Sequence, residues 1–578
     1  MTSPLQATGQ IYSSAEHYPV SEDERRGVVG RIHPWLRYSL FPHMPPTINF
    51  RVENTPALSI PPEIKKVLKW KSTSVTPVII RKVLYNSGMR LVKRSQQWIS
   101  VWAKHMRANM FKTVLEFQKF NHFPGTFQIG RKDTLWRNHL RLRSVHGKRS
   151  YDFVPTTYVI PTDMKQLRHA WEKSGTEQMW IVKPPAAARG SGIKVIHKFV
   201  QIPKMRPLVI QKYLQNPYLI NGMKFDLRIY VYVTSFYPLR IYVHKEGLAR
   251  FACALYSPSS QTVGDRYMHL TNFSINRNYT ANEDVDACKG HKWNCKSLKA
   301  LWGFLADQGH DTTAIWNSIV DLIIKTVISC ENTVSTLTRL NMRNPSSCHE
   351  LFGFDVILDS KLKPWLLEVN ISPSLQSSSK LDVFIKGQMC KDLLNLSGVM
   401  IPPHLDKAFQ ASFLEKASDD AGFGITNLCF DKRIFRSNLS LEERAKQAVF
   451  TRMERHEYLL TVLANPTADD IRQLVLAEDE RSRAGQYICV YPTHHTNRYH
   501  KYFDRARYYN HLFDAWETRY HSCRDDGIQK LIEACKQGLH LKVIPQSASV
   551  IIGSISDSLP FSEESDVSDE DPSFQLSP

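Results

Sequence analysis

Residues 350–375, ELFGFDVILDSKLKPWLLEVNISPSL, contain two apolar runs separated by a short polar segment. The runs Phe354–Leu358 and Trp365–Asn370 are rich in residue types that favour β-strands. The segment between them, Asp359–Pro364, contains Asp, Ser, Lys and Pro, which are typical of turns. This stretch therefore predicts a β-hairpin.

The predicted hairpin brings three oxygen-bearing side chains together. A turn between the runs pairs Asp355 with Glu368, and Asn370 shares the strand face of Glu368 because side chains alternate along a strand. The same alternation places Leu367 and Val369 on the opposite face. Carboxylate and amide oxygens suit Mg²⁺, which takes its other ligands from phosphates and water. The alternative interpretation is a polar strand end with solvated carboxylates.

A loop of small residues lies upstream, between two further predicted strands. The apolar run Gln178–Val182 ends at Lys183, and the loop Ala186–Ile193 follows. Because Gly190 and Gly192 lack a Cβ, backbone N–H groups in this loop can approach phosphates that Lys183 also reaches. No Gly-Lys-Ser/Thr sequence opens a helix here, so the loop is not a P-loop. An ordinary β-turn would explain the same glycines.

Two more strands complete the predicted nucleotide site. Pro207–Leu214 is an apolar strand that runs into a polar link, where its backbone can face an adenine edge. Lys224, Asp226 and Arg228 open the strand Ile229–Val233 and share one face of it. Three charges on one face of an apolar strand are costly to bury unless they are paired or bind a ligand. The alternative is an exposed edge strand.

The predicted site is made of motifs with a definite order and spacing. They are Lys183-Pro-Pro with Arg189-Gly-Ser-Gly192, Gln211-Lys-Tyr-Leu214, Lys224-Phe-Asp-Leu-Arg228, His269-Leu-Thr-Asn272, Asp355, and Glu368-Val-Asn370-Ile-Ser-Pro-Ser374, preceded upstream by Asn121–Lys132. Together they resemble the tubulin tyrosine ligase-like family, and within it the glutamate-adding, or polyglutamylase, branch. The resemblance covers roughly residues 110–400.

The resemblance implies both a fold and a reaction. The fold is α/β (α+β), an ATP-grasp-like ligase core of N-terminal, central and C-terminal subdomains followed by a helical extension. The reaction is an ATP-dependent amide ligation that joins free L-glutamate to glutamate side chains in acidic tubulin tails, beginning chains or making short ones. The acceptor carboxylate attacks the γ-phosphate to give an acyl-phosphate, and the amine displaces phosphate. The implied cofactors are ATP and one or two Mg²⁺ ions.

The resemblance also implies a role for each motif residue. Asp355, Glu368 and Asn370 hold Mg²⁺. Lys224, Arg228, Arg250 and Glu368 serve the chemistry around the transferred phosphoryl group and the incoming amino acid. The residues implied to contact the nucleotide or its acceptor are Lys132, Lys183, Arg189, Gly190, Ser191, Gly192, Gln211, Lys212, Tyr213, Leu214, Lys224, Asp226, Thr271 and Asn272.

Positive charge is concentrated in one part of the chain. The net charge is +20, and residues 61–150 contain 20 Lys and Arg against 3 Asp and Glu. Such an excess favours an acidic partner through long-range attraction. Nucleic acid is the generic candidate, and glutamate-rich tubulin tails, or other acidic proteins, fit a glutamate ligase. The alternative is a solvated basic face.

Composition also indicates where the protein acts. The 578 residues are 42% hydrophobic, with no run of 18 apolar residues and no apolar stretch near the N-terminus, so we expect no membrane span and no secretory signal. The 10 cysteines form no C-x-x-C pair, which indicates reduced thiols. We therefore expect a monomer in the cytoplasm and cytoskeleton, including cilium or basal body. Cys288, His291 and Cys295 lack a fourth ligand at zinc spacing, which favours free thiols.

The chain divides into seven predicted segments. They are a disordered extension at 1–60, a basic N-terminal lobe at 61–155, a central subdomain at 156–213, a C-terminal subdomain at 214–400, a linker at 401–425, a helical module at 426–540 and an acidic disordered tail at 541–578. The helical module resembles the microtubule-binding modules of the family, with an apolar stripe on one helix at Ala445, Val449, Met453, Leu460 and Leu463. A helical hairpin packed against the core is the alternative.

Two other functions fit parts of the same pattern. A glycine ligase of the same family would use the same ATP site with a smaller amino-acid pocket. A basic protein that binds microtubules or nucleic acid could keep an inactive ATP fold. The motif residues Lys183, Asp355, Glu368 and Asn370 are all present, which favours an active ligase.

Overall fold

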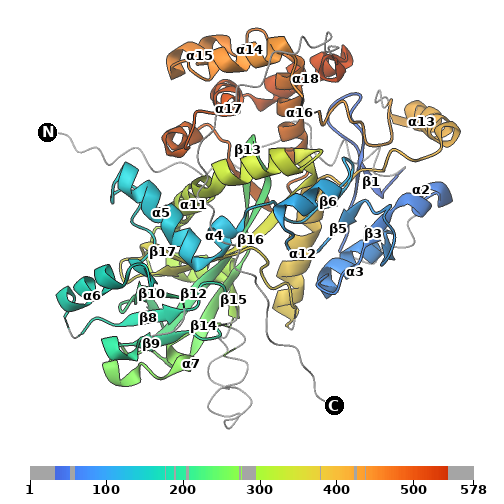
Figure 1. Ribbon diagram of the computed structural model, residues 1–578. Coiled ribbons are helices and arrows are strands. Elements are labelled where there is room, and N and C mark those ends of the chain that lie inside the picture. Colours follow the sequence, from blue (N-terminus) through green and yellow to red (C-terminus); the bar gives the residue numbers. More distant parts are fainter. Residues whose placement is uncertain are drawn as a thin grey trace. The chain divides into compact units, whose positions relative to one another are not determined.

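One long strand, β12 (Met223–Phe236), organises the structure, which is a computed structural model (Figure 1). It lies within an eight-stranded sheet in which β14 and β16 flank its first half, while β16 and β13 flank its second half. The other strands of this sheet are β11 (Leu219–Ile220), β13 (Leu239–His244), β14 (Leu248–Leu255), β15 (Cys295–Ser297), β16 (Glu350–Leu358), β17 (Pro364–Asn370) and β18 (Tyr487–Tyr491).

The described part of the chain belongs to one compact unit, which spans Met1–Val543. The structure describes residues 33–52, 59–175, 177–187, 190–203, 207–272, 275, 295–377, 379–421, 426–436 and 438–543. Arg189, Cys288 and His291 lie outside these ranges, as do the side chain of Cys295 and most of the predicted acidic tail.

The two faces of β12 pack against different helices. Odd-numbered residues such as Leu227 and Val231 lie in a core with helix α11 (Thr312–Asn341). Even-numbered Tyr230 and Tyr232 lie in a second core with helix α12 (Lys380–Ser397). Strand alternation therefore places Lys224, Asp226 and Arg228 on one face of β12, as the sequence predicts. This is the face of the two tyrosines, on the α12 side of the sheet.

Helix α11 is apolar enough to be compared with a membrane span. It has 30 residues, and by length and composition alone it could cross a bilayer. However, 67% of its most apolar window is buried inside the protein. This burial is typical of the core helix of a sheet-based domain, and α11 covers the central sheet in this way (Figure 1).

The predicted hairpin is confirmed. Strands β16 and β17 are antiparallel, and Asp355 lies opposite Glu368. The turn between them contains Leu362 with a φ of 60°, and Asp359 accepts hydrogen bonds from the backbone N–H groups of Lys361 and Lys363. Side-chain capping of this kind is the usual way in which Asp stabilises a turn.

Two four-stranded sheets precede the main one in the chain. The first is a parallel sheet of β4 (Arg90–Val92), β3 (Lys69–Lys71), β5 (Ser100–Val101) and β6 (Lys119–Phe120), accompanied by helices α2 (Pro62–Val67) and α3 (Val78–Asn86). Helices α4 (Phe127–Gly130) and α5 (Lys132–His146) follow it in the chain and contact α11 and β17. The second is an antiparallel sheet of β7 (Thr157–Ile160), β10 (Leu208–Lys212), β8 (Trp180–Lys183) and β9 (Lys194–Ile196), which packs on helix α6 (Met164–Lys173).

The expectation that residues 1–60 lack stable structure is wrong for residues 33–52. Strands β1 (Leu36–Arg37) and β2 (Thr47–Ile48) pair with each other. Trp35 and Phe50 are buried in the core formed with α12. These large apolar side chains, spaced among prolines, anchor the segment despite its Pro-rich composition.

The C-terminal extension is part of the central sheet, not a separate module. Strand β18 pairs with β13 in an antiparallel register, with Val243 opposite Ile488. The predicted linker is also wrong, because residues 407–421 form helix α13 (Lys407–Ala421). The remaining helices gather together, orange to red in Figure 1, and are α14 (Leu441–Phe450), α15 (Arg455–Thr461), α16 (Ala468–Ser482), α17 (Tyr508–Tyr520) and α18 (Arg524–Lys536).

The predicted apolar stripe does not form one buried face. The chain turns after Phe450, so Ala445 and Val449 lie in α14 and Leu460 lies in α15, whereas Met453 and Leu463 lie outside both helices. Val449 and Leu460 are exposed at 54% and 80%, while Met453 and Leu463 contact the helical core only in part. The prediction fails because a helical period does not continue across the turn between α14 and α15.

Charges within the extension are used to hold it together. Arg481 pairs with Glu517 at 2.7 Å, and Arg524 pairs with Glu478 at 2.6 Å and with Glu517 at 2.7 Å. All four side chains are buried. Breaking a buried pair costs about 3–5 kcal/mol because one charge is left uncompensated. These pairs use part of the charge of residues 426–540, which contain 18 Lys and Arg and 16 Asp and Glu.

Removal of the extension should destabilise the rest of the chain. A chain that ends at residue 425 loses β18 and exposes the edge of β13, which invites aggregation. We expect a lower melting temperature and a much lower soluble yield than for a chain that ends at residue 543, which keeps every described element. Equal melting temperatures for the two chains would show that the extension folds independently.

Candidate functional site

A row of charged side chains crosses four neighbouring strands. Arg250 on β14 lies opposite Asp226 on β12. Arg228 on β12 lies opposite Asp355 on β16, which in turn lies opposite Glu368 on β17. Side chains directly opposite each other in an antiparallel pair are close enough to interact. The strand register therefore assembles the row.

The middle of the row is a buried network of ion pairs. Arg250 bridges two carboxylates, with its Nη2 2.6 Å from Asp226 Oδ2 and 2.8 Å from Asp355 Oδ2. Arg228 Nε lies 2.5 Å from Asp355 Oδ1. Burial alone would raise the pKa of Asp355, but the two guanidinium groups hold it well below its usual range. Asp355 is therefore a fixed negative charge.

Glu368, at the end of the row, contacts Lys132 and Asn370. Lys132 Nζ, from the start of α5, lies 3.0 Å from Glu368 Oε2 and also donates to the carbonyl oxygen of Ala187. Asn370 Nδ2 donates to Glu368 Oε1 at 3.3 Å. Lys132 therefore connects the N-terminal lobe to the hairpin, at Glu368, and to the loop Ala186–Ile193, at Ala187. This loop is called the glycine loop below.

The hairpin residues fit a magnesium ion by their chemistry. Among the described residues, no three His, Cys, Asp or Glu side chains cluster as a metal site. An ion here would therefore rest on two carboxylates, Asp355 and Glu368, and the amide of Asn370. Mg²⁺ accepts so few protein ligands because it keeps water and phosphate oxygens.

The prediction that Leu367 faces away from Glu368 is wrong. A bulge interrupts the pairing between Asp355 and Val356, so Glu368 pairs with Asp355 while Leu366 pairs with Val356. The extra residue, Leu367, lines the same pocket as Glu368. Strict alternation cannot predict this, because a bulge adds one residue to one strand only.

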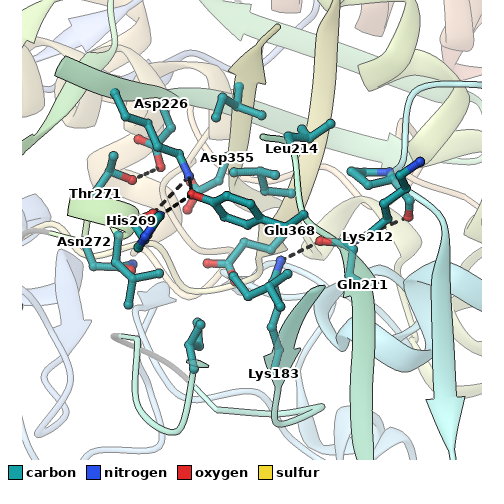
Figure 2. A pocket seen from close by; sticks show the side chains of 18 residues that line it. Lys183, Gln211, Lys212, Leu214, Asp226, His269, Thr271, Asn272, Asp355 and Glu368 are labelled. Atoms are coloured by element: carbon teal, nitrogen blue, oxygen red, sulfur yellow. Dashed lines mark hydrogen bonds between the residues drawn. The ribbon is translucent and has the colours of Figure 1, made fainter. Parts of the chain in front are cut away.

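A pocket lies over the charged row, between the main sheet and the small antiparallel sheet. Figure 2 shows Asp226, Asp355 and Glu368 lining it with Lys183. Eleven of the sequence-predicted residues line this pocket: Lys183, Gln211, Lys212, Tyr213, Leu214, Lys224, Asp226, Thr271, Asn272, Asp355 and Glu368. The roles assigned to these residues stay predictions.

The other predicted residues lie beside the pocket. Arg228, Arg250, Asn370 and Lys132 contact its carboxylates, as described above. The glycine loop adjoins it, and Gly190 and Gly192 have φ values of 74° and 67°. A Cβ on Gly190 would lie 2.7 Å from Ile275, and one on Gly192 would lie 2.8 Å from Pro184. Glycine is therefore required at both positions, whereas Arg189 lies outside the described residues.

Two buried lysines face the pocket. Lys183 donates to Gln211 Oε1 at 2.7 Å, and Gln211 donates in turn to Thr157 Oγ1. Burial lowers the pKa of Lys183 to about 8, although Glu368 raises it. The amide of Gln211 therefore connects Lys183 to Thr157, and its contact with the nucleotide stays a prediction.

Lys224 belongs to a chain of hydrogen bonds along the pocket wall. Its Nζ donates to the hydroxyl of Tyr213 at 2.8 Å and to the carbonyl oxygen of His269 at 3.0 Å. Since Nε2 of His269 faces the carbonyl oxygen of Thr262, Nδ1 accepts from Tyr213 at 2.8 Å. Burial lowers the pKa of Lys224 to about 7, against the opposing effect of Asp226.

Several apolar residues in the pocket were not predicted from the sequence. They are Pro155, Ile181, Ile193, Leu270, Ile357 and Leu367. Ile357 lies two residues after Asp355 on β16, so period two could have identified it. The others come from separate elements that only the fold brings together. A mixed apolar and charged lining suits a ligand with a planar apolar part and an anionic part.

The sheets and the pocket define an ATP-grasp-like α/β core. Residues 108–408 match the sequence model of the Tubulin-tyrosine ligase family. This is 301 of 578 residues, more than half of the chain. The chain belongs to this family, and the sequence-based resemblance is confirmed.

Several relatives align over most of the chain. The human protein named tubulin monoglutamylase TTLL4 is 47% identical over 523 residues, which cover 90% of this chain and 43% of the relative. The Caenorhabditis elegans tubulin polyglutamylase ttll-4 is 37% identical, over 90% of this chain and 83% of the relative. Human tubulin polyglutamylase TTLL5 is 34% identical over 74% of this chain and 33% of the relative. The chain spans less than half the length of these two human relatives.

Proposed function

We propose that this chain is an ATP-dependent tubulin glutamate ligase. It would join free L-glutamate to glutamate side chains in acidic tubulin tails, and begin chains or make short ones. Family membership supports an amide ligase, and the names of the relatives, tubulin monoglutamylase and polyglutamylase, support tubulin and glutamate. The proposal places the protein on the cytoskeleton, including cilium or basal body.

One observation carries the proposal: carboxylates for a metal ion and cations for phosphates line a single pocket. Asp355, Glu368 and Lys224 line it from the main sheet, and Lys183 lines it from β8 of the small antiparallel sheet. Phosphoryl transfer depends on positioning and charge neutralisation more than on covalent chemistry by the protein. The geometry supplies both signs of charge that ATP and a divalent ion require.

The residues would divide the work between the two substrates. The link from Lys212 to Leu214 would hold the adenine against the apolar lining, and Lys183 and the glycine loop would contact phosphates. Asp355, Glu368 and Asn370 would hold Mg²⁺, which neutralises phosphate charge when bound. Arg228 and Arg250 are already engaged by Asp355, so an ion at that carboxylate would compete with them and release donors for anionic groups.

The ligation would proceed in two steps, formation of an acyl-phosphate and its displacement by the amine. A side-chain carboxylate oxygen attacks the γ-phosphorus, the bond to the β-phosphate oxygen breaks, and ADP leaves with an acyl-phosphate formed. The glutamate amine then attacks the acyl carbon, and inorganic phosphate leaves. The amine must lose a proton before it attacks. Lys224, with a pKa lowered to about 7, is a residue of this pocket able to accept a proton near neutral pH.

The basic N-terminal lobe supports an acidic protein substrate. Residues 61–150 contain 20 Lys and Arg against 3 Asp and Glu, and Lys132, which contacts the pocket residue Glu368, is one of them. Long-range attraction would concentrate glutamate-rich tails near the pocket. Other acidic proteins would be attracted in the same way.

Amino-acid incorporation tests the proposal directly. With ATP, Mg²⁺ and microtubules, the protein should incorporate labelled glutamate and not labelled glycine. Glu368→Gln should abolish incorporation, because it removes one charge from the ion site, and should leave the melting temperature nearly unchanged since Glu368 is partly exposed. Incorporation of glycine would favour the glycine ligase, and unchanged turnover by Glu368→Gln would refute the assignment of the metal site. An inactive wild-type protein that still binds microtubules would favour the binding function.

ATP affinity should depend on pH through the two buried lysines. Because charged lysines attract phosphates, the affinity should fall as pH rises from about 6 to 9.5, since Lys224, with a pKa of about 7, loses its proton first and Lys183, with a pKa of about 8, loses its proton next. Lys183→Ala should weaken ATP binding by at least about tenfold at pH 7 and flatten this profile. Isothermal titration calorimetry measures both effects, with Lys194→Ala, at an exposed position of the neighbouring strand, as the control. Normal ATP binding by Lys183→Ala would make the glycine loop a simple turn.

Charge reversal should test the basic lobe. Lys65, Lys66, Lys82 and Lys93 of this lobe are exposed, whereas Lys69 and Lys71 are half-buried. The four exposed lysines are therefore replaced by Glu. Activity on microtubules should fall by about tenfold or more at low salt and converge with wild type at high salt, because exposed charges are screened. ATP affinity without tubulin should not change.

The matched control for this prediction makes the same change of charge in the extension. Lys432, Arg519, Lys530 and Lys536 are all exposed there, and each is replaced by Glu. If the control loses activity at low salt while the lobe variant does not, the helical extension is the tubulin-binding surface.

A further inference from the structure

A second cavity lies where the extension meets the catalytic part. Helix α16 closes one side of it, and the central sheet, the end of α12 and strand β6 form the others. Its volume is about 30 Å³. None of the residues predicted for the nucleotide site lines it. The lining includes Lys119, Thr234, Arg240, His349, Asp479, Glu480 and Arg483.

Four polar atoms of the lining residues are buried without a hydrogen-bond partner in the described structure. They are Nη1 of Arg240, Nε of Arg483 and both ring nitrogens of His349. The three residues are exposed at only 5%, 7% and 3%. An unsatisfied buried donor costs about 1–3 kcal/mol, and more when it is charged. The two arginine donors therefore point to a group that accepts hydrogen bonds.

The charges of the lining residues do not balance. Lys119, Arg240 and Arg483 are positive, whereas Asp479 and Glu480 are negative. Arg240 pairs with Glu480 at 3.1 Å, and Arg483 pairs with Asp479. Lys119 donates to the carbonyl oxygen of Ser346 at 2.7 Å, which supplies no counter-charge. One positive charge is left in excess.

The excess positive charge contributes to lowered pKa values of Lys119 and His349. Burial, together with Arg483 and Arg240, lowers the pKa of Lys119 to about 8, although Glu480 acts in the opposite direction. Burial also lowers the pKa of His349 well below its usual value, with Lys119 and His122 acting in the same direction, so the ring is neutral. Water molecules could accept hydrogen bonds from the arginines, but they would not neutralise the charge.

We propose that this cavity binds one small monovalent inorganic anion of about the size of chloride. A cavity needs about 10–15 Å³ to hold one water molecule, so about 30 Å³ has room for a slightly larger ion. The anion would accept from Arg240 and Arg483 and neutralise Lys119. It would thereby join the N-terminal lobe, which carries Lys119, the central sheet, which carries Arg240, and the end of helix α16, which Arg483 directly follows.

Thermal unfolding of the full chain tests the proposal. Sodium chloride is titrated against sodium gluconate at constant ionic strength, so that only the anion changes. The melting temperature should rise with chloride and saturate, by about 1–3 °C, because a ligand that binds only the folded state stabilises it. Lys119→Met should lose this dependence. Lys112→Met, the same change at an exposed position nearby, should keep it.

Crystals soaked in sodium bromide give a second, direct readout. Bromide has nearly the size and the charge of chloride, and its anomalous signal should produce a peak between Arg240 and Arg483. A peak there, together with chloride dependence that Lys119→Met abolishes, supports the site. Density for water alone, or equal chloride dependence in wild type and Lys119→Met, would overturn the proposal.

Discussion

The bridge that Arg250 makes between Asp226 and Asp355 is the constraint on which the site depends. These carboxylates lie on different strands, β12 and β16, and both are buried. Two buried negative charges so close together would be untenable without a cation between them. Arg250 lies within 2.8 Å of both, and Arg228 adds a second cation at Asp355. The strand register, the ionisation of Asp355 and the charge of the pocket therefore depend on one another.

Buried ion pairs also hold the extension together. Its buried arginines and carboxylates are paired, and β18 completes the edge of the central sheet beside β13. An enzyme core with an exposed edge strand is prone to aggregation. The extension covers that edge and belongs to the same compact unit as the rest of the described chain. Any microtubule contact made by the extension would therefore be made by a surface held rigidly relative to the pocket.

Local patterns in the sequence predicted the hairpin and the charged face of β12. A turn rich in polar residues and a period of two are enough to pair Asp355 with Glu368 and to align Lys224 with Asp226. The side of Leu367 could not be predicted, because a bulge leaves no clear signal in one strand. The role of the extension could not be predicted either, because β18 pairs with a strand more than 240 residues earlier in the chain. Periodicity reports which face is apolar and not which partner covers it.

Strand β12 places three environments along one of its faces. Its even-numbered side chains begin in the pocket with Lys224, continue through the core at Tyr230 and Tyr232, and end at the second cavity with Thr234. Glu480 accepts a hydrogen bond from Thr234 at 2.6 Å, so helix α16 is tied to the same strand that carries the pocket residues. Because the tyrosines between them are fully buried, the strand cannot shift at one end without disturbing a close-packed core. The packing of the extension and the placement of Lys224 are thus two consequences of where β12 lies.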